Sequence, residues 1–266
     1  ECFEPSIHRL SENGIRHIFD VFAAINKKVL TENFPNLFDS ILYRISKSQG
    51  RSAGEFIQPV ELTRFMCGLA DLKKNDKVFN PFAGLASFGV YLEQGQYYFG
   101  QELNQKTWAL GALRLIAYKR PGISEYVCDD SIFRWPKATE KFDLIISNPP
   151  FNIKFGKQDG SIDHDFRTIE QLLIEKGLHS LNQNGKLIAL LPQGFLFRGM
   201  QEQRLREHLV KEDIIETVIS LPGGLLLNTG IPLIILVLNR SKKLAGKVKF
   251  VDATNFVVAN GSKEKV

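Results

Sequence analysis

Short apolar runs alternate with longer amphipathic segments through most of this chain. Apolar runs bounded by Gly, Pro and Asn are typical of buried strands, whereas apolar positions three or four residues apart are typical of helices. Strands are therefore predicted over 76–80, 97–102, 126–131, 143–147, 186–191, 214–221 and 231–239, with an edge strand over 247–251. Helices are predicted over 106–118, 166–181 and 201–210. This alternation of strands and helices indicates an α/β fold.

Residues 1–50 show a different pattern, with apolar stripes at helical spacing. A stripe that includes Ile18 and Phe22 is followed by one that includes Ile41. This spacing predicts a short helical segment over residues 1–50. Because the chain begins with Glu1 rather than Met, we interpret this segment as the end of an N-terminal helical domain of a longer protein.

Composition and charge narrow the functional classes. The 266 residues are 44% hydrophobic, which supports a sizeable core, and the net charge of +5 with a pI near 9.0 is compatible with a nucleic acid partner. Cys2, Cys67 and Cys128 have no paired spacing and the histidines have no metal-ligand spacing, so we expect neither a disulfide framework nor a metal site. Cys67 and Cys128 stand in apolar segments, which predicts core positions. Few cysteines and no long apolar run favour a cytoplasmic protein with no membrane contact.

The predicted strand 143–147 leads directly into Asn148-Pro149-Pro150-Phe151. Pro149 cannot donate to a sheet ladder, and Pro150 holds Pro149 in an extended conformation, so this tetrapeptide is stiff. Asn148 and the proline carbonyls offer hydrogen-bond acceptors, while Phe151 offers a flat apolar face. An exocyclic amine such as that of adenine could give both hydrogens to two such carbonyls while its ring stacks on Phe151. The alternative interpretation is a proline-terminated strand with a chance aromatic residue.

Two further segments stand where an α/β sheet binds a nucleotide-like ligand. The first predicted strand runs into a turn of small residues, 81–89, where backbone can approach a ligand closely, although the turn is neither a dinucleotide-binding nor a Walker motif. Glu102 ends the second predicted strand, about 20 residues past this turn, where an acid can accept hydrogen bonds from both hydroxyls of a ribose. A surface glutamate that caps the following turn is the alternative.

The tetrapeptide Asn148–Phe151 after an apolar strand resembles the catalytic motif of amino-methyltransferases that use S-adenosylmethionine, in particular the DNA adenine-N6 methyltransferases. The stretches 221–224 (Leu-Pro-Gly-Gly) and 229–232 (Thr-Gly-Ile-Pro) narrow the resemblance to the modification subunits of type I restriction–modification systems. The resemblance implies a Rossmann-like methyltransferase sheet, mostly parallel with an antiparallel last strand. It also implies a methyltransferase catalytic domain over residues 51–266.

The resemblance also assigns individual residues to the site. The catalytic residues that it implies are Asn148, Pro149, Pro150 and Phe151. Residues 54–59 are similar to the Gly-x-Phe-x-Thr-Pro segment that wraps the methionine end of the cofactor. Phe56, Gln58 and Pro59 are therefore implied in cofactor binding, with Gln58 in place of the usual Thr. Pro59 also suits the first position of a helix.

The turn 80–88 is similar to the Asp-Pro-x-x-Gly-x-Gly-x-Phe turn of these methyltransferases, which implicates Asn80, Gly84 and Ala86 in cofactor binding. Asn80 stands where Asp is usual and lacks the charge that favours a cationic cofactor. Ala86 stands where Gly is usual and adds a methyl group where backbone contact is wanted. These two departures predict weaker binding of the cofactor.

Two acids complete the implied cofactor site. Glu102 matches the acid that binds the cofactor's ribose, and Asp130, followed by Ser131, matches the acid that contacts its adenine amine. Asp129 is the alternative to Asp130. The polar loop 152–165 that follows the tetrapeptide is expected to form a flap over a bound base.

The implied activity is methyl transfer to the N6 amine of adenine in DNA. Holding both amine hydrogens on carbonyl oxygens draws the nitrogen lone pair out of conjugation, which makes the amine a better nucleophile. The expected partners are DNA, flipped at the target base, and the specificity and restriction subunits of a type I system. Two alternatives stay open: a methyltransferase acting on RNA or protein glutamine, and a methyltransferase-like scaffold with a weakened cofactor site.

Overall fold

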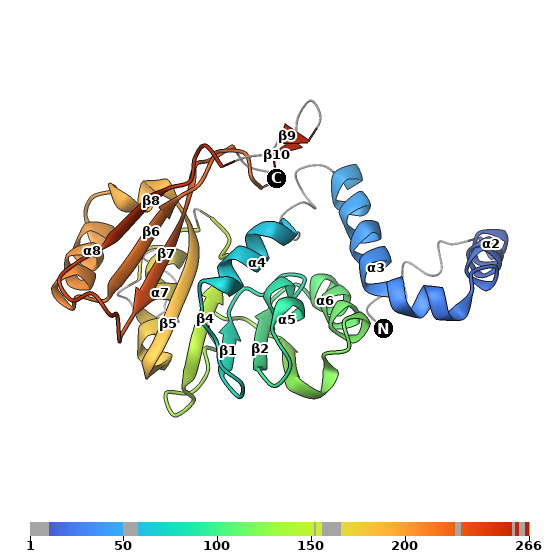
Figure 1. The fold of residues 1–266 in the computed structure, drawn as a ribbon, viewed down its shortest axis with the longest axis horizontal. Coiled ribbons are helices and arrows are strands. Elements are labelled where there is room, and N and C mark those ends of the chain that lie inside the picture. The colour runs from blue at the N-terminus through green and yellow to red at the C-terminus, as the bar shows by residue number, and fades with distance from the viewer. Residues whose placement is uncertain are drawn as a thin grey trace.

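The structure, a computed structural model, describes residues 11–49, 58–151, 153–155, 166–226, 230–256, 259–260 and 264–265. Within these residues one large sheet crosses the molecule with helices on both faces (Figure 1). Its strands are β1 (Lys77–Asn80), β2 (Tyr97–Glu102), β3 (Ser124–Cys128), β4 (Phe142–Ser147), β5 (Leu181–Pro192), β6 (Ile215–Ser220), β7 (Leu233–Asn239) and β8 (Lys249–Asp252). The α-helices are α2 (Glu12–Ala23), α3 (Lys27–Gln49), α4 (Val60–Gly68), α5 (Ser87–Tyr91), α6 (Gln105–Ala117), α7 (Ile169–Ser180) and α8 (Gln201–Lys211). Two 3₁₀ turns, η2 (Pro121–Ile123) and η3 (Gln193–Leu196), and a small hairpin of β9 (Ala259–Asn260) and β10 (Glu264–Lys265) complete the described elements.

The sheet has the strand order β3-β2-β1-β4-β5-β7-β6-β8. Neighbouring strands are parallel except for β7, which runs antiparallel to both β5 and β6. The predicted α/β class, with a mostly parallel sheet and an antiparallel last strand, is confirmed, and β7 is that antiparallel strand. The edge strand predicted over 247–251 is β8. The order reverses direction between β1 and β4, the kind of position where open α/β sheets bind ligands.

Both faces of the sheet are covered, which explains why its strands read as unbroken apolar runs. In β4, Leu144 and Ile146 join the core on the side of α4, α5 and α6, while Ile145 joins the core on the side of α7 and α8. All seven residues of β7 are buried, as expected for an unbroken apolar run in the middle of a sheet covered on both faces. Burial of this kind contributes about 25 cal/mol for each Å² of apolar surface removed from water.

Strand β5 begins earlier than the sequence predicts. The strand was predicted over 186–191, but α7 ends at Ser180 and β5 starts at the next residue, Leu181, which pairs with Phe142 of β4. The register between these strands shifts just after that pair. A Cβ on Gly185 would lie 3.0 Å from the Phe142 carbonyl oxygen, so glycine permits the close approach inside the strand.

The N-terminal segment is helical, as predicted, and Figure 1 shows α2 and α3 leading away from the sheet. Asp39 of α3 is held at α6 by the Arg114 guanidinium, with Nε–Oδ1 and Nη2–Oδ2 distances of 2.6 and 2.8 Å. The Tyr118 hydroxyl donates to the same carboxylate at 2.7 Å. The division of the chain at residue 50 stays a prediction.

The burial prediction for Cys128 is wrong. Cys128 is exposed and Cys67 is partly buried. The reason is topological: β3 is the edge strand of the sheet, and none of its residues is fully buried. Among the described helices, none combines the length and the apolar character that a bilayer crossing requires.

Candidate functional site

The predicted site residues converge at one edge of the sheet, because β1, β2, β3 and β4 are parallel and their carboxyl ends lie together. Asn148-Pro149-Pro150-Phe151 directly follows β4 at the point where the strand order reverses. Pro149 is buried and Pro150 is exposed, whereas Asn148 and Phe151 are partly buried. Phe151 packs against the core on the side of α4. Within the described part of the chain, no group forms a hydrogen bond with the Asn148 side chain.

Two buried side chains fasten the end of β4 to the turn after β1. The Ser147 hydroxyl donates to the Pro81 carbonyl oxygen at 2.7 Å. In the opposite direction, the Asn80 Nδ2 donates to the Ile146 carbonyl oxygen at 2.8 Å and to that of Pro81 at 3.1 Å. Asn80 and Ser147 are 1% and 0% exposed, so water does not compete for these bonds. The tetrapeptide and the turn 81–86 are therefore held in a defined relation to each other.

The remaining acceptor of Asn80 is also used inside the protein. The Tyr98 hydroxyl donates to Asn80 Oδ1 at 3.0 Å, and Tyr98 is fully buried. Its ring passes so close to Gly89 and Gly100 that a Cβ on either would lie within 3 Å of it. An aspartate at position 80 would bring carboxylate oxygens against two carbonyls, whereas the amide donates to both. The asparagine therefore fits a positioning role here, and its part in cofactor binding stays a prediction.

Removing the hydroxyl that pairs with Asn80 should destabilise the protein. We expect Tyr98→Phe to lower the free energy of unfolding by about 1–2 kcal/mol, because Asn80 Oδ1 is left buried without a donor. Chemical denaturation measures this difference. Tyr97→Phe is the matched control, since the Tyr97 hydroxyl donates to Glu125 at an exposed position and its loss should cost less than about 0.5 kcal/mol. Equal effects of the two substitutions would contradict the proposed role of Tyr98.

The turn after β1 departs from ordinary backbone at three positions. Phe82, Gly84 and Ala86 have φ values of 58°, 56° and 53°. A left-handed conformation costs a non-glycine residue roughly 1–2 kcal/mol, so the packing around Phe82 and Ala86 must offset this strain. Ala86 is fully buried among core residues, so its methyl group fills the core. Gly84 is fixed on both sides, since its N–H donates to Glu102 at 2.9 Å and its carbonyl accepts from the Tyr126 hydroxyl.

Glu102 joins the turn to the segment that follows β2. One carboxylate oxygen accepts the Gly84 N–H at 2.9 Å, and the other accepts the Asn104 N–H at 2.7 Å. Burial raises the pKa of the Glu102 carboxyl, and the backbone hydrogen bonds from Asn104 and Gly84 offset part of that rise. The capping interaction considered above is thus present, but each carboxylate oxygen keeps a second lone pair that can accept from a hydroxyl. Ribose binding by Glu102 stays a prediction.

Two acids stand at the end of β3, next to Glu102. Asp129 N–H donates to the Glu102 carbonyl oxygen at 3.0 Å, and the Asp129 carboxylate lies 3.5 Å from the Arg134 guanidinium. Asp130 Oδ1 accepts the Ile132 N–H at 2.8 Å and so closes the turn. Both carboxylates are partly exposed at the edge that carries the other site residues. The assignment of Asp130 to the cofactor's adenine amine stays a prediction.

The segment implied at the methionine end of the cofactor is described only from Gln58 onward, and Phe56 lies outside the described residues. Gln58 is 7% exposed, and its Nε2 donates to the Met66 sulfur at 3.6 Å. The expectation that Pro59 is the first helical residue is wrong by one position. Pro59 is the cap of α4, because it has extended backbone and its carbonyl accepts both the N–H and the hydroxyl of Thr63.

Residues 30–266 match the family described as N-6 DNA Methylase. The chain belongs to the N-6 DNA methylase family. It is 27% identical over 247 residues to the type I restriction enzyme HindI methylase subunit of Haemophilus influenzae, covering 82% of this chain and 53% of that protein. It is 28% identical over 226 residues to the MjaVII methylase subunit of Methanocaldococcus jannaschii, covering 76% and 39%.

A solved structure with a similar fold is also a type I methyltransferase subunit. A type I restriction–modification methyltransferase subunit from Streptococcus thermophilus superposes with a TM-score of 0.71 at 27% identity, over 79% of this chain and 49% of that one. The chain thus spans about half the length, or less, of the relatives it matches. The predicted resemblance to DNA adenine methyltransferases of type I systems is confirmed at the level of the family.

Sequence reasoning missed the residues that position the candidate site. Tyr98 and Ser147 hold the ends of β1 and β4, and Tyr126 holds Gly84. A signal for Tyr98 was available, because Gly100 lies two residues further along the same strand and on the same face. A glycine next to a large ring on one strand face marks a place where the ring can lie flat over backbone.

The predicted flap 152–165 lies outside the described residues except for residues 153–155. Phe155 N–H donates to the Arg167 carbonyl oxygen at 3.0 Å, and Ile169 N–H donates to that of Ile153 at 3.1 Å. These bonds place the N-terminus of α7 beside the segment that follows Phe151.

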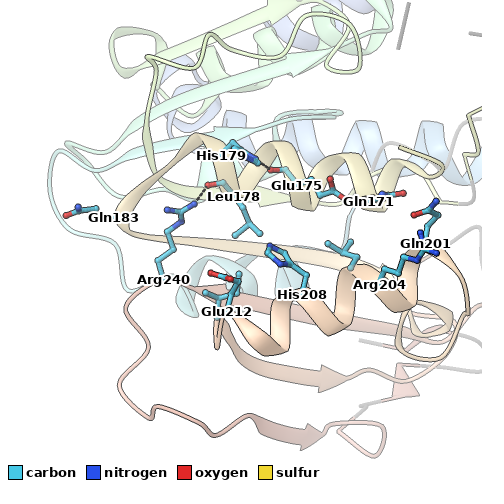
Figure 2. A pocket seen from close by; sticks show the side chains of 12 residues that line it. Gln171, Glu175, Leu178, His179, Gln183, Gln201, Arg204, His208, Glu212 and Arg240 are labelled. Carbon is cyan, nitrogen blue, oxygen red and sulfur yellow. Dashed lines mark hydrogen bonds between the residues drawn. The ribbon is translucent and has the colours of Figure 1, made fainter. Parts of the chain in front are cut away.

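A groove of about 640 Å³ lies elsewhere, between α7 and α8 (Figure 2). Glu175, His179, His208 and Arg204 are among its lining residues, and none of the predicted site residues is. Arg240 closes one end by donating to the Leu178 carbonyl oxygen at 2.6 Å. Among the described residues, no three His, Cys, Asp or Glu side chains are arranged to hold a metal ion.

Proposed function

We propose that this chain is the catalytic core of a type I modification subunit, and that it transfers a methyl group from S-adenosylmethionine to the N6 amine of adenine in DNA. The observation that carries the proposal is the position of Asn148–Phe151 at the carboxyl end of β4, fastened to the turn after β1. Membership of the N-6 DNA methylase family and the names of its type I relatives support the same acceptor.

The residues at this edge fit the proposed cofactor. Glu102 offers a carboxylate with free lone pairs at the end of β2, which suits two ribose hydroxyls. The turn 81–86 offers backbone beside it, and the buried Ala86 methyl group does not stand in the way. Asp130 lies one strand further along the same edge. When bound, S-adenosylmethionine supplies an electrophilic methyl group attached to a sulfonium.

The acceptor side of the reaction follows from the tetrapeptide. Asn148 Oδ1 and the Pro149 carbonyl oxygen take the two amine hydrogens, while the Phe151 ring stacks on the base. Both prolines limit the backbone to one shape, so these acceptors do not have to be ordered when the base arrives. The nitrogen lone pair then points away from the ring plane and toward the cofactor side of the site. Catalysis by this arrangement depends on orientation and charge complementarity.

The partners follow from the same proposal. DNA lies over the carboxyl edge of the sheet with its target adenine flipped out, and the specificity and restriction subunits of a type I system join the full-length protein. Such a function places the protein in the cytoplasm. The division into a helical segment, residues 1–50, and a catalytic domain, residues 51–266, belongs to this proposal. The departures at Asn80 and Ala86, which favoured a scaffold role, have structural explanations in the core.

The test is the identity of the methyl acceptor. The full-length methylase with its specificity subunit is incubated with tritium-labelled S-adenosylmethionine and, separately, with unmodified plasmid DNA, total RNA and cell protein. We expect label in DNA alone, and mass spectrometry of the digested DNA should identify N6-methyladenine. Label in RNA or protein, or cofactor binding without any transfer to DNA, would contradict the proposal.

A further inference from the structure

Arg114 of α6 is a buried cation whose guanidinium binds two separate parts of the molecule. Its side chain is 5% exposed by residue and takes no part in the proposed methyl transfer. On one side, Nε and Nη2 donate to the two carboxylate oxygens of Asp39 in α3, which passes beside α6 (Figure 1). On the other side, Nη1 donates to the Leu85 carbonyl oxygen at 3.2 Å and to the Ser87 hydroxyl at 2.9 Å. One planar group therefore connects the helical segment to the turn after β1.

Asp39 and two tyrosine rings keep this guanidinium charged and in one orientation. Burial alone would lower the pKa of Arg114, but the hydrogen bond and the charge of Asp39 raise this pKa above its ordinary value. The Tyr91 and Tyr118 rings have their centroids 6.0 and 5.8 Å from the guanidinium carbon, within the range of cation–π attraction. The Tyr118 hydroxyl also donates to Asp39, so the carboxylate is itself held in place. A forked pair of this kind fixes the direction in which the third nitrogen, Nη1, points.

The Leu85 carbonyl lies at the strained part of the turn. Leu85 stands between Gly84 and Ala86, which both have left-handed backbone, and this conformation is unfavourable for alanine. Rotating the peptide group between Leu85 and Ala86 would change the φ of Ala86 and relieve that strain. The same rotation would turn the Leu85 carbonyl oxygen away from Arg114 Nη1 and break their hydrogen bond. Arg114 therefore opposes a relaxation that would change the backbone of the turn.

Given the proposed function, in which the turn 81–86 meets S-adenosylmethionine, we propose that Arg114 is a positioning residue for cofactor binding and that Asp39 sets its orientation. Arg114 acts through the Leu85 carbonyl and needs no contact with the cofactor. Cofactor affinity then depends on how α3 packs against α6, because loss of the Asp39 carboxylate frees the guanidinium. The chemical step at Asn148 proceeds at its normal rate once the cofactor is bound.

The alternative is a purely structural ion pair between α3 and α6. Such a pair would contribute to the free energy of unfolding and leave the cofactor affinity of the folded protein unchanged. Ser87 separates the two possibilities, because it binds Arg114 on the side of the turn and takes no part in the pair with Asp39. Ser87 is the first residue of α5, where alanine is a good helix former.

The test uses the full-length methylase with Asp39→Asn, Ser87→Ala, both changes together, or Glu216→Gln. Asp39→Asn removes the charge and one acceptor oxygen and keeps the size of the side chain. Glu216→Gln is the matched control, because Glu216 of β6 forms a partly buried ion pair with Lys186 of β5, away from the turn. Calorimetric titration measures the dissociation constant of S-adenosylmethionine. Turnover on DNA with the specificity subunit present gives the KM for the cofactor and kcat, and thermal unfolding gives Tm.

We expect Asp39→Asn to raise the dissociation constant and the KM for S-adenosylmethionine roughly fivefold to twentyfold, with kcat at saturating cofactor within about twofold of wild type. Ser87→Ala should raise both constants about threefold. The double variant should resemble Asp39→Asn, because both changes act through the same guanidinium. Glu216→Gln should lower Tm and leave both constants unchanged.

Wild-type cofactor affinity in Asp39→Asn together with a lowered Tm would identify a structural pair and overturn the inference. Wild-type affinity in Ser87→Ala would also overturn it, and this variant decides the question if Asp39→Asn does not fold. Fully additive effects in the double variant would contradict a shared route through Arg114. A wild-type protein that binds no S-adenosylmethionine would instead refute the proposed function itself.

Discussion

Replacing Asn148 with alanine should abolish methyl transfer to DNA, lowering the turnover rate by at least about a thousandfold, while S-adenosylmethionine still binds. The side chain is partly exposed at the end of β4 and pairs with no group in the described part of the chain. In the proposed site it takes one of the two amine hydrogens, and no other side chain in the tetrapeptide can replace it. Tritium transfer measures the rate, and calorimetric titration measures cofactor binding.

Two further variants separate chemistry from folding. Asn148→Asp keeps an acceptor oxygen and should retain more activity than Asn148→Ala. Asn182→Ala serves as the control, because Asn182 is also partly buried but lies at the start of β5, where it donates to Asp143 at 2.6 Å. It should lose some stability and keep its turnover rate. Near-normal turnover in Asn148→Ala would refute the proposed role of the tetrapeptide.

The second large effect is expected at Glu102. Glu102→Ala should weaken S-adenosylmethionine binding roughly a hundredfold, or about 3 kcal/mol, because two charge-assisted contacts are lost together. One is the proposed pairing with the ribose hydroxyls, and the other is the hold on the Gly84 N–H, which shapes the turn. Calorimetric titration measures the dissociation constant. Glu125→Ala on the neighbouring strand should leave it unchanged, and an unchanged constant in Glu102→Ala would remove Glu102 from the site.

The same carboxylate sets a pH dependence. Burial raises the pKa of Glu102 above its ordinary value of 4.5, so the group takes up a proton at a higher pH than an exposed glutamate does. Cofactor affinity should therefore fall as the pH is lowered, with a midpoint above 4.5. Because the pKa of Glu102 is raised in the folded protein, burial disfavours its charged form there. Protonating Glu102 as the pH falls therefore does not lower the free energy of unfolding. Glu102→Gln should lack this titration.

The predicted elements agree with the structure where the pattern is local. The run 231–239 corresponds to β7, and its unbroken apolar composition correctly indicates a strand covered on both faces. The start of β5 was predicted wrongly, because Asn184-Gly185 has the composition of a turn. Pairing with β4 draws these residues into the strand, and Gly185 fits there because of its approach to Phe142.

The candidate site, too, could be predicted from the sequence only in part. Asn148 and Glu102 follow apolar strands directly, so their positions at strand ends could be predicted from sequence alone. The environment of Asn80 could not be predicted. Its partners Tyr98 and Ile146 are 18 and 66 residues away, and only the sheet brings them within hydrogen-bond distance.

The sequence by itself determined the α/β class, the end of β4 at two prolines and the residue types available for binding an amine and a ribose. These properties depend on periodicity and on proline chemistry, which act within a few residues. Only the tertiary structure decided that Asn80 faces inward and that the Ala86 methyl group fills the core. Each of these depends on which strands become neighbours, and neighbouring strands are distant in the chain.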